Sequence, residues 1–372
     1  MNDERGPSGR PDGEVRPDVS PLAAGIRARA AQAPIPAAVV MAEALYAPDG
    51  YYRRTEGPWG FQGADYYTAL DLGPLLGEAM ACRLEQVWER LGRPDPFVVL
   101  EPGAGRGWLG RDLLQAAQGP FAEALRYLHR DDNPAAAAAA RTALAPHLAS
   151  GRARLVAQDE PLAPFLGAII SNELFDALPA QPWRWDGERW QFEALAASGP
   201  VWLPGEPCEA TEWFTGQAEG GLESGDGAPW CAGLPALVQD LAGSLRAGLF
   251  LAIDYGETAS RLLDKGADLR RFKGHTVDGL WWDDLGGSDL TADVDFTRLA
   301  GLLGQQGLAA LDGPWHQTLG RWIRAHAPLA QWESGWQALA APERLRRMEN
   351  LLQLTLPSMM GDRFRVLEAW KG

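Results

Sequence analysis

The chain has 372 residues and a formal net charge of −15 at pH 7; 46% of its residues are hydrophobic and 22% are charged. This composition is typical of globular proteins, and the length suffices for one large domain or for two domains that share a cleft. The acidic charge repels the phosphates of DNA and RNA, and no apolar run reaches the roughly twenty residues that a membrane-spanning helix needs. We therefore expect a folded protein with no nucleic-acid partner and no membrane span.

The cysteines and histidines indicate neither a disulfide framework nor a metal site. Cys82, Cys208 and Cys231 are widely spaced and form no CxxC pair, which suits a reducing compartment. The five histidines form no HxH or HExxH pair, and the N-terminus has no apolar targeting segment. We expect a cytoplasmic protein without a metal ion.

Two different segments precede the first predicted strand. Residues 1–20 are rich in Pro, Gly and charged residues and contain almost nothing apolar, so we predict a disordered tail. Residues 21–92 are predicted as an N-terminal helical region, with a break at Pro34 and Pro36 and a strongly amphipathic helix over residues 73–91. A helical region therefore leads into the sheet.

Strands and helices alternate from residue 93 onward. The predicted strands cover residues 95–101, 126–131, 153–157, 168–172 and 248–254, and the predicted helices cover residues 108–118, 134–149 and 234–246. Strands separated by helices imply a parallel sheet covered on both faces. We expect an α/β fold whose core comprises residues 93–182 and 234–372, with a last strand from "DRFRVLEAW" beside the strand at 248–254.

An insertion of residues 183–233 interrupts the alternation. Trp183, Trp185 and Trp190 alternate as in a β-hairpin, and a Gly/Glu-rich loop follows near residues 216–228. The chain's many tryptophans are either stacking platforms for bases or sugars, or parts of the core and of a lid. The acidic net charge favours the second interpretation. We expect an inserted hairpin and acidic loop.

The stretch "VVLEPGAGRGWLG" at residues 98–110 is typical of a strand that turns tightly into a helix close to a polar ligand. Dinucleotide-binding turns need a third glycine where this chain has Trp108, so a nicotinamide cofactor is disfavoured. A ligand that carries an ammonium and no phosphate fits the acidic residue before the turn, and S-adenosylmethionine is such a ligand. We predict cofactor contacts from Glu101, Gly103, Gly105 and Gly107.

Acidic side chains follow two further predicted strands. Asp131 ends the strand after the glycine turn, where a carboxylate would bind ribose hydroxyls, although it could instead cap the helix that begins at Pro134. Asn172, Glu173 and Asp176 follow the strand at 168–172, at the edge where open α/β sheets bind their ligands. The alternative for these three residues is a solvated first turn of a helix.

Several separate blocks together resemble the MidA family of S-adenosylmethionine-dependent methyltransferases. They are "ALYAPDGYY", "GADYYTALDLGPLLG", "LEPGAGRGWLGRDLL", "SNELFDALPAQPW", "AIDYG" and "DLTADVDF". The resemblance extends from about residue 34 to the C-terminus and implies a class I, Rossmann-like methyltransferase core with S-adenosyl-L-methionine as cofactor. It implies cofactor contacts at Glu101, Gly103, Gly105 and Asp131, closure of the site by Asp65 and Thr68, and a catalytic crevice at Asn172, Glu173 and Asp176.

The resemblance also implies an activity, because a mitochondrial relative in this family methylates an arginine of a respiratory complex I subunit. We therefore expect a protein substrate with an accessible arginine, whose guanidinium two carboxylates would grip because its pKa lies above about 12. The alternatives are a methyltransferase for a small molecule or another residue, and a cofactor-binding assembly factor without activity.

This chain departs from the family pattern at several positions. Ala69 replaces a serine, Asp131 stands where glutamate is usual, and Asp293 stands where histidine is frequent. Arg270 and Arg271 belong to a basic spot that we interpret as a solvated loop.

Overall fold

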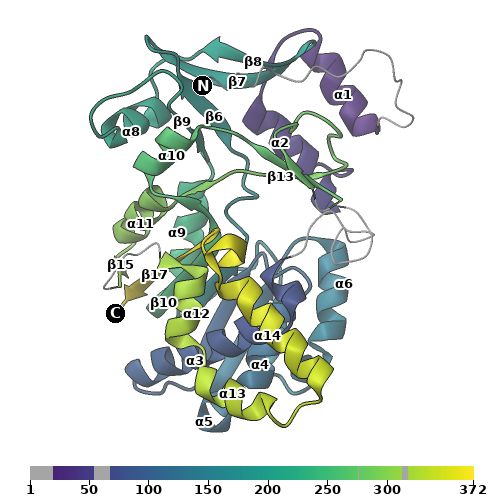
Figure 1. Cartoon of the computed structure of the whole chain (residues 1–372), viewed down its shortest axis with the longest axis vertical. Helices are drawn as coiled ribbons and strands as arrows, with labels where there is room; N and C mark the ends of the chain where they lie inside the picture. The colour runs from purple at the N-terminus through teal and green to yellow at the C-terminus, as the bar shows by residue number, and fades with distance from the viewer. Residues whose placement is uncertain (1–19, 54–67, 275, 312–316) are drawn as a thin grey trace.

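The computed structural model describes residues 20–53, 68–274, 276–311 and 317–372. The predicted disordered tail, apart from Ser20, and the predicted site residue Asp65 lie outside the described residues. Figure 1 shows the main sheet and its helices in the lower part of the molecule, and smaller sheets with the N-terminal helices in the upper part.

The main sheet is mostly parallel. Its long strands lie in the order β4 (Ala153–Val156), β3 (Leu125–Arg130), β2 (Phe97–Pro102), β5 (Phe165–Asn172), β10 (Leu245–Glu257) and β17 (Phe364–Lys371). Strands β4 to β10 pair in parallel, whereas β17 is antiparallel to β10, with Leu249 opposite Trp370. The short strands β14 (Val294–Asp295), β15 (Ala309–Ala310) and β16 (Gln317–Thr318) extend this sheet. The predicted α/β fold and the predicted final strand are confirmed.

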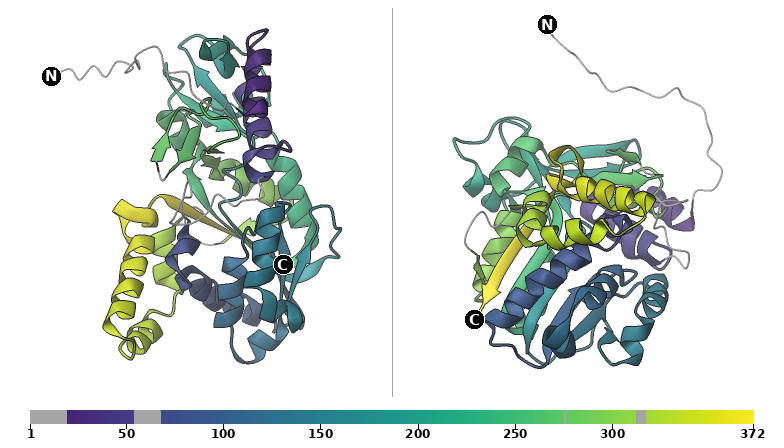
Figure 2. Two further views of the ribbon diagram at one scale, coloured as in Figure 1. Left: turned by 90° about the vertical axis from the view of Figure 1, so that its right-hand side faces the viewer. Right: turned by 60° about the horizontal axis from the view of Figure 1, so that its bottom comes forward.

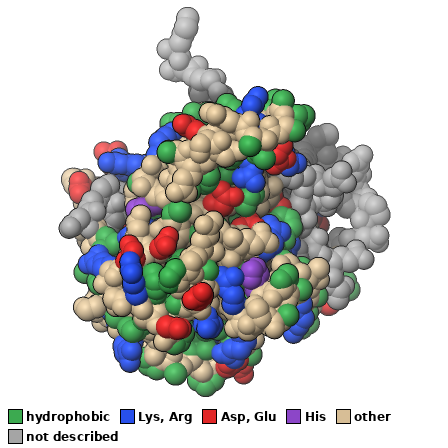
Figure 3. Space-filling view, turned by 90° about the horizontal axis from the view of Figure 1, so that it is seen from below, with side chains coloured by type: hydrophobic (Ala, Val, Ile, Leu, Met, Phe, Trp, Pro, Cys, Tyr) green, Lys and Arg blue, Asp and Glu red, His purple; other side chains and the backbone are tan. Residues whose placement is uncertain are grey.

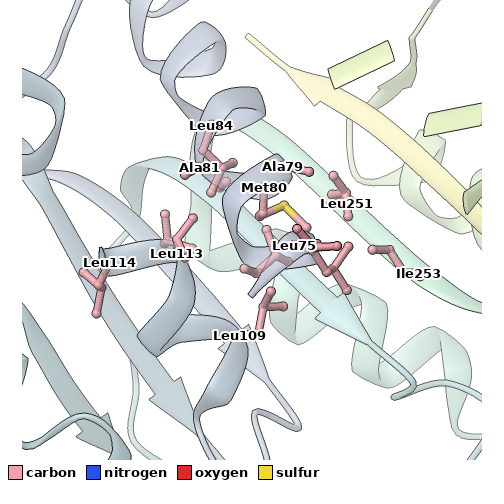
Figure 4. Packing of buried hydrophobic residues seen from close by; sticks show 14 of the residues in the cluster. Leu75, Ala79, Met80, Ala81, Leu84, Leu109, Leu113, Leu114, Leu251 and Ile253 are labelled. Atoms are coloured by element: carbon pink, nitrogen blue, oxygen red, sulfur yellow. The ribbon is translucent and has the colours of Figure 1, made fainter. Parts of the chain in front are cut away.

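Helices cover both faces of the main sheet. On one face lie α3 (Leu75–Arg90), α4 (Trp108–Ala116) and α12 (Leu319–His326), and on the other lie α9 (Leu234–Ser244) and α11 (Phe296–Gln305). Figure 4 shows α3 packed between α4 and the strand β10, with Met80 near Leu251 and Ile253. Each fully buried leucine or methionine of this kind stabilises the fold by about 1.5–3 kcal/mol.

The close approach of α3 and α4 depends on one glycine. A Cβ atom at Gly77 would lie 2.5 Å from the Cβ of Asp112, which is closer than two such atoms can come. The helix α4 therefore rests directly on the backbone of α3, and α3 fixes the position of the glycine turn that precedes α4.

The remaining helices complete the lower part. They are α5 (Gly119–Ala124), α6 (Pro134–Ala143), α7 (Ala145–Ala149), α13 (Leu329–Trp336) and α14 (Ala341–Thr355), followed by the turn Pro357–Gly361. The single helix predicted over residues 134–149 is divided into α6 and α7, because Pro146 has no N–H to continue α6. On the lower face that Figure 3 shows, basic and acidic side chains are interspersed.

The insertion forms a second sheet in the upper part. It comprises β6 (Gln181–Trp185), β7 (Trp190–Ala196), β8 (Gly199–Pro204) and β9 (Gly227–Trp230), with α8 (Glu209–Gln217) and the N-terminal strand β1 (Ile35–Pro36) paired to β7. The predicted hairpin is confirmed by the antiparallel pair β6 and β7. Trp183 and Trp190 are buried against Phe214 and Trp230, so these tryptophans are part of a local core.

A third, small antiparallel sheet consists of β11 (Arg270–Lys273), β12 (Thr276–Asp278) and β13 (Asp289–Thr291). The interpretation of Arg270 and Arg271 as a solvated loop is wrong, because Arg271 is buried and forms ion pairs with Asp278 at 2.6 Å and Asp283 at 3.1 Å. Apolar side chains from this region pack in one cluster with α1 (Pro21–Ala30) and α2 (Ala37–Tyr46); they are Leu269, Trp281, Leu285, Leu290 and Ala292. Figure 2, left, shows α1 in purple in this upper part, away from the C-terminal helices in yellow. A short helix, α10 (Ala259–Lys265), leads from β10 into this region.

Candidate active site

A pocket of about 820 Å³, including space that opens to solvent, lies at the carboxyl ends of β2, β5 and β10. These strands are neighbours in the main sheet, so the loops that follow them meet at one edge. The segments around residues 52 and 68–70 and the strands β11 and β13 complete the wall. The pocket therefore lies between the lower and the upper parts of the molecule.

The glycine turn forms the floor of this pocket. Gly103 and Gly105 line it with left-handed backbones, at φ values of +64° and +50°. A Cβ atom at Gly103 would lie 2.8 Å from Leu174, whereas one at Gly105 would meet no described atom within 4 Å. Gly107, also left-handed at +69°, is not among the lining residues; it packs against α6 and its following segment. Gly105 thus presents bare backbone to the pocket, whereas Gly107 packs against the α6 region.

Glu101 lies at the inner end of the pocket. Its side chain is buried, lines the pocket and accepts a hydrogen bond from the Tyr127 hydroxyl at 2.6 Å. Burial raises the pKa of Glu101 to about 8, against the opposing effect of the Tyr127 hydrogen bond. A cation in the pocket would favour the ionised form of this carboxyl group.

Asp131 faces an adjoining recess that shares Gly103, Gly105 and Glu173 with the pocket. Its carboxylate accepts the N–H of Gly105 and the N–H of Asn133, each at 2.8 Å. Asn133, and not Asp131, caps α6, because its side chain accepts the N–H groups of the first turn. The capping alternative for Asp131 is therefore wrong. Apolar side chains of Leu174, Leu178 and Leu237 line the same recess.

The loop after β5 brings Asn172, Glu173 and Asp176 to the pocket wall. Asn172 and Asp176 are buried, so the alternative of a solvated helical turn is wrong. Asn172 Nδ2 donates to Glu173 Oε1 at 3.0 Å, while its Oδ1 is buried without a hydrogen-bond partner among the described residues. Glu173 adopts a left-handed backbone at φ +53°, which is unfavourable for a residue with a Cβ atom.

Burial raises the pKa values of both acidic groups in this loop. The pKa of Glu173 rises to about 8, first through loss of water and then through repulsion by Asp176. The pKa of Asp176 rises to about 6, again through loss of water, with the positive charge of Arg270 opposing the shift. Strongly shifted carboxyl groups that converge in a cleft are a physical sign of a functional site.

Asp254, at the end of β10, holds this loop in place and was missed by the sequence reasoning. It is fully buried, and its Oδ2 accepts N–H groups from Leu174, Phe175 and Asp176 at 3.1, 2.8 and 3.4 Å. Burial and repulsion by Asp176 raise its pKa well above the ordinary value. The sequence did contain a signal for Asp254: it lies in the block "AIDYG", near the end of a predicted strand.

The sequence did not predict the residues that form the upper wall of the pocket. They are Tyr52, Tyr255, Phe272, Asp289 and Thr291. The Tyr52 hydroxyl donates to Asp289 Oδ1 at 2.8 Å, which ties the segment after α2 to β13. The blocks "ALYAPDGYY", "AIDYG" and "DLTADVDF" contain Tyr52, Tyr255 and the two wall residues of β13, so the resemblance was the available signal, whereas Phe272 on β11 lies outside every block. The upper wall thus adds aromatic faces and a further carboxylate to the pocket.

Thr68, which the resemblance places among the residues that close the site, lines the pocket wall. Its N–H and hydroxyl group donate to Asp71 Oδ2 at 2.8 and 3.2 Å. The other oxygen of Asp71 accepts from Arg106 at 2.9 Å, and the Arg106 guanidinium stacks on the Trp108 ring, 3.6 Å from its centroid. Trp108 itself also lines the pocket.

No group of three or more His, Cys, Asp or Glu side chains in the described ranges could hold a metal ion. No helix within those ranges is long and apolar enough to cross a membrane.

The residues present fit S-adenosylmethionine, the predicted cofactor. The Asp131 carboxylate suits ribose hydroxyls, and the leucine side chains of the recess suit a purine ring. Glu101 and the unpartnered Asn172 Oδ1 suit an ammonium group. The bare backbone at Gly105 leaves room for the ligand to pass from the recess into the pocket.

The parallel sheet, the glycine turn and the acidic pocket define a Rossmann-like, ligand-binding α/β protein. The chain belongs to the S-adenosyl-L-methionine-dependent methyltransferase family Methyltransf_28, whose model matches residues 79–314. S-adenosylmethionine is therefore its cofactor, and the resemblance to the MidA-like methyltransferases is confirmed.

Relatives and solved structures agree with this assignment. The chain is 26% identical to the Drosophila melanogaster "Protein arginine methyltransferase NDUFAF7 homolog, mitochondrial", over 91% of this chain and 82% of the relative. It is 25% identical to the Danio rerio protein arginine methyltransferase NDUFAF7, over 74% and 70%. The fold is similar to that of a COG1565 superfamily member from Burkholderia thailandensis, solved with S-adenosyl-homocysteine, at a TM-score of 0.82 and 24% identity over 96% and 95% of the two chains.

Proposed function

We propose that this methyltransferase transfers its methyl group to an arginine side chain of a protein. The observation that carries the proposal is the convergence of Glu173, Asp176 and Asp289 on one pocket beside the aromatic rings of Tyr255 and Phe272. Buried carboxyl groups repel one another, and a cationic acceptor relieves that repulsion. Arginine combines a permanent charge with a flat guanidinium that stacks on aromatic rings, so it matches both features of the pocket.

The pocket residues would orient the acceptor. When bound, S-adenosylmethionine supplies a sulfonium methyl group that a nitrogen acceptor takes by in-line displacement, so positioning accounts for most of the rate enhancement. Glu173 and Asp176 accept hydrogen bonds from the guanidinium and hold its plane in one orientation. One of these carboxylates then accepts the proton that the methylated nitrogen loses.

Two further observations support the proposal. The relatives from Drosophila melanogaster and Danio rerio are both named protein arginine methyltransferases. The net charge of −15 favours the approach of a basic protein segment and opposes that of an anionic substrate.

The test measures transfer of a labelled methyl group from S-adenosylmethionine to protein in a cell extract, followed by mass spectrometry of the labelled residue. We expect methylarginine from the wild type and at least a 100-fold loss of turnover in E173Q, with cofactor affinity unchanged. The matched control is E193Q. Glu193 is also a largely buried carboxyl group, with its pKa raised by burial to about 7, but it lies outside the pocket.

Other outcomes would contradict the proposal. Labelled lysine, or label confined to small molecules, would assign the same site to a different acceptor. Cofactor binding without any transfer would identify an assembly factor. Unchanged turnover in E173Q would remove Glu173 from the reaction.

A further inference from the structure

The site as described offers partners for the ammonium group and the ribose hydroxyls of S-adenosylmethionine, but none for its carboxylate. The lining of the pocket contains the acidic residues Glu101, Glu173, Asp176 and Asp289, each of which repels a carboxylate once it is ionised. Among the described lining residues, Arg106 is the single Lys or Arg side chain. We propose that Arg106 binds the α-carboxylate of the cofactor.

The position of Arg106 in the turn supports this role. Arg106 follows Gly105 directly and lines the pocket, whereas Asp131 lines the adjoining recess. Because both spaces share Gly105, a ligand with its ribose at Asp131 crosses the turn at that glycine. Its amino-acid end then lies in the pocket, between Glu101, which suits the ammonium, and Arg106, which suits the carboxylate.

Neighbouring residues hold the guanidinium of Arg106 in place before any ligand binds. Asp71, whose side chain is 2% exposed, accepts a hydrogen bond from it at 2.9 Å, and the Trp108 ring stacks on it. The Arg106 side chain itself is 14% exposed. A guanidinium carries five N–H donors in one plane, so a group that the bond to Asp71 already orients can also donate to a second anion. Little side-chain entropy remains to be lost on binding.

The experiment compares two ligands that differ only in the carboxylate: S-adenosylmethionine and its decarboxylated analogue. Isothermal titration calorimetry measures both affinities for the wild type and for R106M. We expect the wild type to prefer S-adenosylmethionine by about 10- to 100-fold, the range of a hydrogen bond between charged groups. In R106M that preference should fall to within about threefold of unity, and the affinity for the analogue should stay unchanged.

The matched control is R111M. Arg111 also lies near the Trp108 ring and pairs with Asp112, but it is not among the lining residues, so its loss should leave the preference intact. If R106M unfolds because Asp71 is left buried without its cation, the double variant D71N/R106M removes both charges and serves in its place. An equal loss of affinity for both ligands would assign Arg106 a merely structural role and overturn the proposal. A preference that persists in the variant would overturn it as well.

Discussion

The Asp254 carboxylate accepts the Phe175 N–H at 2.8 Å, a hydrogen bond between the strand β10 and the loop that follows its neighbour β5. The same oxygen accepts two further N–H groups of the loop that carries Glu173 and Asp176. A residue of β10 therefore holds in place the loop that follows β5. This contact explains how Glu173 keeps an unfavourable backbone conformation in the pocket.

Replacing Asp254 tests this account. In D254A we expect a loss of about 1–3 kcal/mol of unfolding free energy for the buried N–H groups left without a partner, and turnover at least tenfold lower. D254N keeps one oxygen acceptor for the loop but turns its NH2 group toward the Tyr255 N–H, which donates to the other Asp254 oxygen at 2.8 Å. It should therefore lose less stability and turnover than D254A. Urea unfolding and single-turnover kinetics measure the two effects. Equal losses of stability and turnover in both variants would mean that the oxygen that accepts the loop N–H groups does not position the loop.

Gly105 and Gly119 form a matched pair of glycines. Both have left-handed backbones, at φ +50° and +55°, and a Cβ atom at either would meet no described atom within 4 Å. G105A and G119A should therefore lose a similar stability, about 1 kcal/mol each. G105A alone should weaken S-adenosylhomocysteine binding, by at least tenfold, because its methyl group enters the space between pocket and recess. Similar calorimetric affinities for the two variants would contradict the position assigned to the ligand.

The buried carboxyl group of Glu101 should make stability depend on pH. Its pKa is about 8 in the folded protein and about 4.5 in its ordinary state. Between these values the folded state binds more protons than the unfolded state, so the free energy of unfolding falls as the pH rises toward 8. E101Q cannot ionise and should lose less stability over that range. Thermal unfolding of both proteins from pH 5 to pH 8.5 measures the difference, and parallel curves would contradict the raised pKa.

Cofactor binding should release a proton from Glu101. At pH 7 the group is mostly protonated in the free protein, and the ammonium of S-adenosylmethionine favours its ionised form. Calorimetry in two buffers with different ionisation enthalpies measures the number of protons released. We expect release of between half a proton and one proton from the wild type, and close to none from E101Q. Equal proton release from the wild type and from E101Q would mean that the proton comes from another group.

Turnover should rise with pH across the neutral range. Asp176 and Glu173 have raised pKa values of about 6 and about 8, and a cationic acceptor binds better once they are ionised. At saturating cofactor, kcat/KM should therefore increase from pH 6 to about pH 9 and then level off. In E173Q, the pH profile of any residual activity should lack the rise that the higher pKa causes. A profile that falls over this range would contradict a role for ionised carboxylates.

Several elements could be predicted because their signals are local. The strand β2 and the turn after it follow from an apolar run that ends in Glu101 and alternating glycines, and α3 follows from its apolar stripe. Asn172 and Asp131 were found because parallel strands place their carboxyl ends at one edge of the sheet. In each case the residues of a short stretch of sequence suffice to predict the element or the position of the side chain.

Other features depend on partners that are distant in the chain. Tyr52 and Asp289 are separated by more than two hundred residues and meet only because α2 packs against the third sheet. Asp254 reaches the loop after β5 only because β10 pairs with that strand. Gly107 shares the left-handed backbone of the other turn glycines, and only its contact with α6 and its following segment distinguishes its role.

The sequence by itself determined the parallel α/β core, the methyl-donor cofactor and the acidic residues on the strand ends, because hydrophobic periodicity and turn chemistry act over a few residues. The tertiary structure decided which of these residues share one pocket and which side chains complete its upper wall. It also decided their protonation, because the pKa of a carboxyl group depends on the water it has lost and the charges brought near it by folding.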